Sequence, residues 1–255
     1  MPWKASEQDR LLREKQFHDL QAFNRSICPS FAENLAKTDE WYLGHVSWVT
    51  HAIDLLGKLT GKVVLDWGCG HGMASCLFAR RGAHVFAIDL SGGYCRETHM
   101  RTLNQSVAVS VVQSDGQRLP FPAEVFDAVW GHAMLHHLSI RDALIEVRRV
   151  LKPDGVFVFC DPFQGGESIR LLRSISGFLK GHRTVDENPI CWSDLRVFLD
   201  IFPDSLATFW DIPLCFQGQL QGCWPKRRTI MQSFARYVVV TNAGLEKIYN
   251  LSIMK

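Results

Sequence analysis

The feature that most constrains the fold is an alternation of short apolar segments with helical patterns between residues 62 and 161. Five apolar segments have the length and composition of buried strands: 62–67, 84–90, 107–115, 126–131 and 155–161. This order predicts right-handed crossovers and an α/β fold with a parallel sheet covered on both faces. Ligands in such folds bind at the carboxyl ends of the strands, so these ends are where functional residues are expected.

The charge balance gives no support for a nucleic-acid or membrane-surface partner. The 255 residues include 28 Lys and Arg against 26 Asp and Glu, a net charge of +2. No apolar stretch approaches the roughly 20 residues of a bilayer span, and the N-terminus lacks the apolar region of a signal peptide. The eight cysteines are scattered without a CxxC pair, which indicates reduced thiols. We therefore expect a cytoplasmic protein without a membrane span.

A glycine-rich turn follows the first predicted strand, with the pattern D-x-G-x-G-x-G from Asp66 to Gly72. Glycines let the backbone turn tightly and approach a ligand closely. The dinucleotide motif G-x-G-x-x-G would need its third glycine at position 73, where the chain has Met73. A carboxylate directly before the glycines would repel a pyrophosphate but suits a ligand with an ammonium group. The spacing therefore disfavours a nicotinamide-dependent oxidoreductase.

Acidic residues also end the second and third predicted strands. Asp89 lies 23 positions after Asp66, where an acid can accept hydrogen bonds from both hydroxyls of a ribose. The alternative for Asp89 is a surface residue that caps the next helix. Asp115 precedes Gly116, and such a pair can accept from an adenine amino group while a backbone N–H meets a ring nitrogen. By itself this pair would indicate only a turn.

Five motifs resemble, in order and spacing, those of class I S-adenosylmethionine-dependent methyltransferases: VVLDWGCGHG, AIDLS, SDGQRLPFP, FDAVWGHAMLHHL and EVRRVLKPDGVFVF. The chain is most similar to the subgroup of ubiquinone and menaquinone biosynthesis and other small-molecule enzymes, the type 11 methyltransferases. The resemblance covers about residues 60–161 and implies a Rossmann-like, seven-stranded, mostly parallel sheet. One departure is Trp67, where the family has a smaller aliphatic residue.

The resemblance also implies S-adenosylmethionine as the cofactor and S-adenosylhomocysteine as its product. The loop at 66–72 would hold the methionine end, Asp89 the ribose, and Asp115 with Gly116 the adenine. The residues expected at the cofactor are Asp66, Gly68, Cys69, Gly70, Asp89, Leu90, Asp115, Gly116 and His132.

Three histidines follow the fourth predicted strand, and His132 and His136 would share one helix face. Because no carboxylate or thiol stands nearby in the sequence, we expect no metal. His136 and His137 could simply satisfy local hydrogen bonds, or one could act as a general base near pH 7. In similar sugar and small-molecule O-methyltransferases, a paired histidine here works with an aspartate that ends the fifth strand. This similarity implies His136, His137 and Asp161 as catalytic residues, with His132 as a second choice for substrate contact.

The flanking regions predict the organisation of the chain. We expect an N-terminal helical cap at 1–60 and a methyltransferase domain at 61–255, in which segments 163–200 and 213–233 form helices or insertions over the substrate pocket. The cap includes predicted helices at 5–26 and about 39–59. Three further residues could contact a polar substrate or form a salt-bridged turn: Arg183, Asp186 and Glu187.

The sequence thus favours a small-molecule methyltransferase that acts on oxygen, with carbon and nitrogen left open. An inactive protein of the same fold, serving as a binding or scaffold partner, is the alternative, and the acids at 66, 89 and 115 argue against it. Arsenite methylation would need thiols that converge on the pocket, which the cysteine spacing does not demand. The partly apolar cap segments suit a glycoside, a phenol or quinone, a polyketide or a lipid-like acceptor. The oligomeric state is left open.

Overall fold

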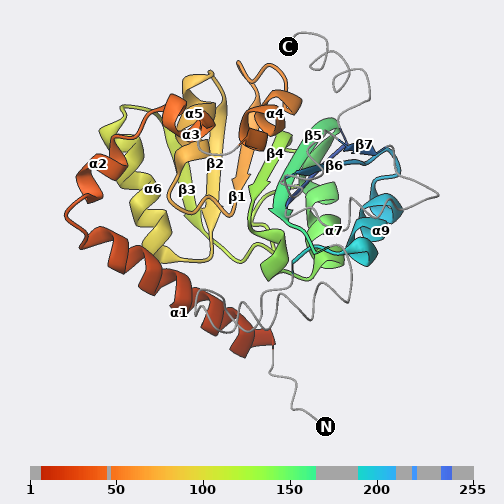
Figure 1. Ribbon diagram of the computed structural model, residues 1–255, viewed down its shortest axis with the longest axis horizontal. Coiled ribbons are helices and arrows are strands. Elements are labelled where there is room, and N and C mark those ends of the chain that lie inside the picture. The colour runs from red at the N-terminus through yellow and green to blue at the C-terminus, as the bar shows by residue number, and fades with distance from the viewer. Residues whose placement is uncertain (1–6, 45–46, 165–188, 211–219, 223–236, 243–255) are drawn as a thin grey trace.

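An eight-stranded sheet in the order β3-β2-β1-β4-β5-β8-β6-β7 forms the centre of the computed structural model in Figure 1. The structure describes residues 7–44, 47–164, 189–210, 220–222 and 237–242, and the account below concerns these ranges. Five strands are parallel: β1 (Val63–Trp67), β2 (His84–Asp89), β3 (Val109–Gln113), β4 (Phe126–His132) and β5 (Leu151–Pro162). Three strands extend the sheet in antiparallel pairing: β6 (Leu206–Trp210), β7 (Leu220–Gly222) and β8 (Tyr237–Thr241).

This topology confirms the predicted α/β, Rossmann-like fold with a mostly parallel sheet. The strand β7 lies within segment 213–233, which the sequence predicts as an insertion, and it adds a three-residue edge beside β6. Arg183, Asp186 and Glu187 lie outside the described residues, as do the remainder of segment 213–233 and residues 165–188 of the other predicted insertion.

The helices alternate with the parallel strands as predicted. Four precede the sheet: α1 (Glu7–Ser26), α2 (Phe31–Leu35), α3 (Asp39–Gly44) and α4 (Ser47–Leu55). The others are α5 (Met73–Arg80), α6 (Gly92–Asn104), the 3₁₀ turn η1 (Leu135–His137), α7 (Ile140–Val150) and α9 (Trp192–Ile201). The predicted helix at about 39–59 corresponds to α3 and α4, between which residues 45–46 lie outside the described ranges.

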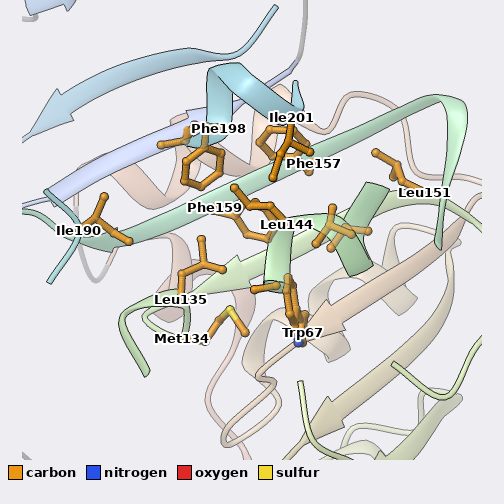
Figure 2. Close-up of a cluster of buried hydrophobic side chains, with 14 of the residues drawn as sticks. Trp67, Met134, Leu135, Leu144, Leu151, Phe157, Phe159, Ile190, Phe198 and Ile201 are labelled. Atoms are coloured by element: carbon orange, nitrogen blue, oxygen red, sulfur yellow. The ribbon is translucent and has the colours of Figure 1, made fainter. Parts of the chain in front are cut away.

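The sheet buries a different apolar cluster on each face, because neighbouring residues of a strand point to opposite sides. Leu65 and Phe157 belong to the cluster under α7 and α9, whereas Val64 and Val158 belong to the cluster under α4 and α5. Figure 2 shows the first cluster, in which Phe198 of α9 lies against Phe157 of β5. Such double coverage explains why the strands read as continuous apolar runs. Helix α4 precedes residue 60 but shares this second core with the sheet. The predicted division into a cap at 1–60 and a methyltransferase domain at 61–255 therefore stays a prediction.

The long helix α1 crosses the carboxyl-end side of the sheet and follows the lower edge of the molecule in Figure 1. It is fixed to the start of α6 by polar contacts: the Asp19 carboxylate accepts from Ser91 Oγ at 2.6 Å and from Gly93 N at 2.9 Å. Gly93 permits this approach, since a Cβ there would lie 2.8 Å from Ala22 Cβ. No helix among the described residues is both long and apolar enough for a membrane span.

Candidate active site

A cavity of about 230 Å³ opens at the carboxyl ends of β1, β2, β3 and β4. Eight of the residues predicted to act at the site line it: Gly68, Gly70, Asp89, Leu90, Asp115, Gly116, His132 and His137. We call the side formed by the loops after β1, β2 and β3 (residues 68–71, 89–90 and 114–116) the cofactor wall. We call the opposite side, formed by α1 (Arg10, Leu11, Glu14, His18 and Gln21), the helix wall. The predicted strand ends therefore meet at one site, and α1 covers it.

The glycine loop after β1 needs its glycines for two different reasons. Gly68 has a φ of +72°, and a Cβ there would lie 2.8 Å from Met134 Cβ. Gly70 has a φ of +50°, but a Cβ there would meet no atom within 4 Å. The first glycine thus permits close packing, whereas the second leaves space beside the backbone for a ligand.

Asp89 joins the glycine loop to the end of β2. One carboxylate oxygen accepts from Gly70 N at 2.9 Å, and the other accepts from Ser91 N at 2.8 Å. Desolvation raises the pKa of Asp89, although these two backbone hydrogen bonds act in the opposite direction. Each carboxylate oxygen can accept a further hydrogen bond, so the residue retains acceptors for a pair of ligand hydroxyls.

The backbone of the loop after β3 packs directly against Trp67. A Cβ at position 116 would lie 2.6 Å from Trp67 Nε1, so only glycine fits there. Asp115 shapes the loop by accepting from Gln117 N at 2.9 Å. The indole Nε1 of Trp67 is buried and has no acceptor among the described residues. A planar ring with acceptor nitrogens and an amino group, as in adenine, would suit the Asp115 carboxylate and the loop backbone that line the cavity here.

Two of the predicted cofactor residues, Asp66 and Cys69, do not line the cavity. The Asp66 side chain is 2 % exposed and accepts a hydrogen bond from Ser75 Oγ of α5. Burial raises the pKa of Asp66 to about 7. Because neighbouring strand residues face opposite sides, Trp67 lies on the cavity side and Asp66 on the α5 side. The thiol of Cys69 is buried 3.6 Å from Thr98 Oγ1, so direct cofactor contact by either residue stays a prediction.

The two adjacent histidines each have a carboxylate partner. His136 Nδ1 lies 2.8 Å from Asp161 Oδ1, which also accepts from the His136 backbone N–H. Asp161 is 1 % exposed, and its Oδ2 has no hydrogen-bond partner among the described residues. His137 Nδ1 lies 2.9 Å from Glu14 Oε2. The structure thus brings together the predicted pair His136 and Asp161, although only His137 of the two histidines lines the cavity.

Other histidines near the cavity have contrasting environments. Burial lowers the pKa of His71 to about 3, and nearby arginines act in the same direction. Burial also lowers the pKa of His18, but hydrogen bonds to Glu14 and Gln21 outweigh it, so the net shift is upward. His132 lies edge-on to Trp48 of α4, with ring centroids 5.0 Å apart. Burial therefore keeps His71 neutral, whereas the raised pKa of His18 reflects its contacts with Glu14 and Gln21.

Sequence reasoning expected a helical cap at 1–60 but named none of the α1 residues that line the cavity. Glu14, His18 and Gln21 follow one another at helical spacing and share the cavity-facing side of α1. The sequence does carry this spacing, but a polar face of a helix is usually a solvated one. The expectation of no metal rested on the absence of a carboxylate near the histidines, and the fold places Glu14 beside His137 from more than a hundred positions earlier in the chain.

The comparisons with known proteins agree with this architecture. Residues 65–159 match the family model described as a methyltransferase domain. A malonyl-[acyl-carrier protein] O-methyltransferase from Salmonella typhimurium is 37% identical over 129 residues, which cover 49% of this chain and 50% of that protein. A demethylmenaquinone methyltransferase from Thermobifida fusca is 36% identical over 166 residues, covering 62% of this chain and 70% of that protein.

A solved structure shows the same fold at low sequence identity. It is a geranyl diphosphate C-methyltransferase from Streptomyces coelicolor, in complex with Mg²⁺, geranyl diphosphate and S-adenosyl-L-homocysteine. Its TM-score is 0.61 at 15% identity, with 84% of each chain covered.

The sheet order, the glycine loop and the acids at the strand ends define a class I methyltransferase fold. The match to the demethylmenaquinone methyltransferase spans most of that relative, and this chain belongs to the class I S-adenosylmethionine-dependent methyltransferases. S-adenosylmethionine is the cofactor of this family. For the first four curated relatives, the chain spans about half of the relative's length or less.

Proposed function

We propose that this protein transfers a methyl group from S-adenosylmethionine to a small molecule, with an oxygen atom as the favoured acceptor. The observation that carries the proposal is the meeting of two groups of residues at one edge of the sheet. The glycine loop, Asp89 and Gly116 form a ligand cavity, and the pair His136 and Asp161 lies directly beside its lining residue His137.

The cofactor wall suits the three parts of S-adenosylmethionine. Asp89 would accept from the ribose hydroxyls, and Asp115 would accept from the adenine amino group while a backbone N–H of the Asp115–Gly116 loop donates to a ring nitrogen. Gly68 and Gly70 would let the methionine end pass close to the backbone. The bound cofactor supplies a sulfonium-activated methyl group, so the protein's main task is to hold the acceptor in line with it.

His136 is the proposed general base for an acceptor hydroxyl. Asp161 accepts from Nδ1–H, which leaves the Nε2 lone pair of the neutral ring available for a proton. When Nε2 takes the hydroxyl proton, the imidazolium is stabilised by the Asp161 carboxylate 2.8 Å away. Asp161 is buried and points its second oxygen at no described donor, so its charge acts mainly on His136. The ring of His137 is tilted by 40° against that of His136, with centroids 4.1 Å apart, and His137 is the second candidate for the base.

The activities for which the relatives are named guide the choice of acceptors. One relative is an O-methyltransferase for malonyl-[acyl-carrier protein], and another methylates demethylmenaquinone. We therefore rank quinone-like or phenolic compounds and lipid-like acyl compounds first, followed by glycosides and polyketides. Every cysteine that the structure describes is free, which fits the proposal of a reducing, cytoplasmic setting.

The test is incubation of the protein with methyl-labelled S-adenosylmethionine and separate acceptor fractions: quinones and phenols, acyl compounds, glycosides, amines and arsenite. Calorimetric titration of the same sample with S-adenosylmethionine measures cofactor binding independently of transfer. Label in an oxygen-bearing fraction supports the proposal. Cofactor binding without label in any fraction would favour a binding or scaffold protein, and absence of cofactor binding would overturn the assignment of the cavity.

A further inference from the structure

The helix wall and η1 together form a cluster of nitrogen and oxygen donors beside the proposed pair of His136 and Asp161. Glu14 and His18 lie one turn apart on α1, and His137 lies on η1. Glu14 Oε2 is 2.9 Å from His137 Nδ1 and 3.5 Å from His18 Nε2. One donor atom from each residue lies within 4.8 Å of the other two. The cluster comes from two elements that are distant in the sequence and meet at the cavity.

The hydrogen bonds around His18 determine which of its two ring nitrogens can act as a metal ligand. Gln21 Oε1 accepts from the Tyr94 hydroxyl at 3.1 Å and lies 3.1 Å from His18 Nδ1. Because Gln21 Oε1 is an acceptor, His18 Nδ1 must donate to it. In the neutral ring, Nε2 then presents its lone pair toward the Glu14 carboxylate. A cation between this ring and the Glu14 carboxylate is a proton when His18 Nε2 donates to Glu14, and it can be a metal ion when the ring is neutral.

His137 Nδ1 is the third donor atom of the cluster. His137 Nδ1 is buried and, despite its distance of 2.9 Å from Glu14 Oε2, makes no hydrogen bond of acceptable geometry with the described residues. Glu14 itself is only 2 % exposed. A buried carboxylate beside two imidazoles is a common metal-ligand set, and the cation could otherwise be a shared proton.

We propose that Glu14, His18 and His137 bind one divalent metal ion of the zinc type. Ligand atoms at 2.0–2.2 Å from one zinc ion lie roughly 3.3 Å apart in a tetrahedron, and the two measured separations from Glu14 Oε2 bracket this value. Two imidazoles favour zinc, iron or cobalt over magnesium or calcium, which prefer oxygen ligands. The hydrogen bond from His18 to Gln21 is the outer contact that fixes the ring of a metal-binding histidine.

The position of the cluster gives the ion a role. All three residues line the cavity, so a fourth coordination position would open toward it and accept an oxygen atom of water or of a bound ligand. The ion would also connect α1 to η1, and thus hold the helix wall against the element that carries the paired histidines. A bound metal ion should therefore also stabilise the folded protein against unfolding.

The experiment uses the full-length protein after treatment with a chelator that is then removed. Titration with Zn²⁺ is followed by calorimetry, and titration with Co²⁺ by visible absorption, which reports nitrogen and oxygen coordination. We expect one ion per chain and a Zn²⁺-dependent rise in the thermal midpoint. His18→Ala should lower the Zn²⁺ affinity roughly 100-fold or more, and Gln21→Ala roughly 10- to 100-fold, since loss of an outer contact alone has that effect.

The matched controls are His99→Ala and Glu33→Gln, which change exposed residues outside the cluster and should bind metal like the wild type. Circular dichroism checks that each variant is folded. If His18→Ala does not fold, Gln21→Ala still tests the proposal, because it retains all three ligands. Two results would overturn the proposal: no saturable metal binding by the wild type, or equal binding by the wild type and the folded His18→Ala and Gln21→Ala variants. The first result would leave a shared proton as the cation of the cluster. Neither readout depends on methyl transfer.

Discussion

The two walls of the cavity are built by different means. The cofactor wall relies on backbone donors and on glycines, and its contacts are short in sequence: Gly70 N to Asp89 spans 19 positions, and Gln117 N to Asp115 spans 2. The helix wall relies on charged and amide side chains, several of whose partners are far away in the sequence. Arg10 donates to the His137 carbonyl across 127 positions.

This difference predicts that the cofactor wall is rigid and tolerates few substitutions, whereas the helix wall tolerates more of them. A wall of backbone atoms at strand ends is fixed by the sheet itself, and a side chain added at Gly116 would meet Trp67. A wall of side chains is held by individual hydrogen bonds and ion pairs, each of which contributes on the order of 1 kcal/mol. We therefore expect the cofactor wall to determine the donor, and the helix wall and histidine pair to determine the acceptor and the efficiency of transfer.

The strongest test of this division is His136→Ala. Loss of the general base should lower kcat roughly 10²- to 10⁴-fold, whereas the dissociation constant of S-adenosylmethionine should stay close to that of the wild type. Labelled-methyl turnover and calorimetric titration measure the two quantities. His84→Ala is the control, because His84 is exposed at the start of β2, at the opposite end of the strand from Asp89. Wild-type turnover in His136→Ala would remove this residue from the base role.

Asp66, which directly precedes the loop of the cofactor wall, tests whether a buried carboxylate destabilises the folded protein at neutral pH. The folded protein keeps a proton on Asp66 up to about pH 7, whereas an unfolded carboxyl loses it above about 3.8. The free energy of unfolding therefore falls as the pH rises between these values. Asp66→Asn removes this dependence, so its stability advantage over the wild type should grow by roughly 2–3 kcal/mol between about pH 5 and pH 8.

Denaturant unfolding across this pH range, without cofactor, measures the effect of Asp66→Asn. Asp154→Asn is the control, because Asp154 is exposed near the start of β5. A difference between Asp66→Asn and the wild type that is the same at each pH would contradict the raised pKa of Asp66.

Asp89→Ala tests the ribose assignment on the cofactor wall. The variant removes a charged acceptor for two ligand hydroxyls, so S-adenosylmethionine binding should weaken by about 1–3 kcal/mol. The Gly70 and Ser91 N–H groups lose the same partner, and a folding control by thermal unfolding is needed. Calorimetric titration gives the affinity. Unchanged affinity in a folded Asp89→Ala protein would show that the ribose lies elsewhere.

How much of this site the sequence could predict follows from the same contrast. Asp89, Asp115 and the glycines were predictable, because a parallel sheet brings all its strand ends to one edge whatever the side-chain packing. The pairing of His136 with Asp161 followed for the same reason, since β4 and β5 are neighbours. The eight-strand order was less accessible, because β7 has only three residues.

The remaining features depend on packing that no local pattern encodes. A strand that is buried on both faces has no alternation of polar and apolar residues. The sequence therefore carries no signal that Trp67 faces the cavity and Asp66 faces α5. The seating of α1 rests on contacts such as those of Asp19 with the start of α6. Such contacts appear only once the two helices have been placed side by side.

The smallest effect should come from Glu7, at the start of α1 beside the helix wall. Gln117 Nε2 donates to Glu7 Oε1 at 2.7 Å, and Gln117 Oε1 accepts from Ser139 N at 2.8 Å, so one amide connects α1 to the start of α7. Glu7→Ala removes only the first of these bonds, and cofactor affinity should fall by about 0.5–1.5 kcal/mol, mainly through faster dissociation. Glu33→Gln is again the control, and stopped-flow release of S-adenosylmethionine is the measurement. A loss in Glu7→Ala as large as that in Asp89→Ala would mean that the helix wall binds the cofactor as strongly as the cofactor wall does, and the division between the two walls would fail.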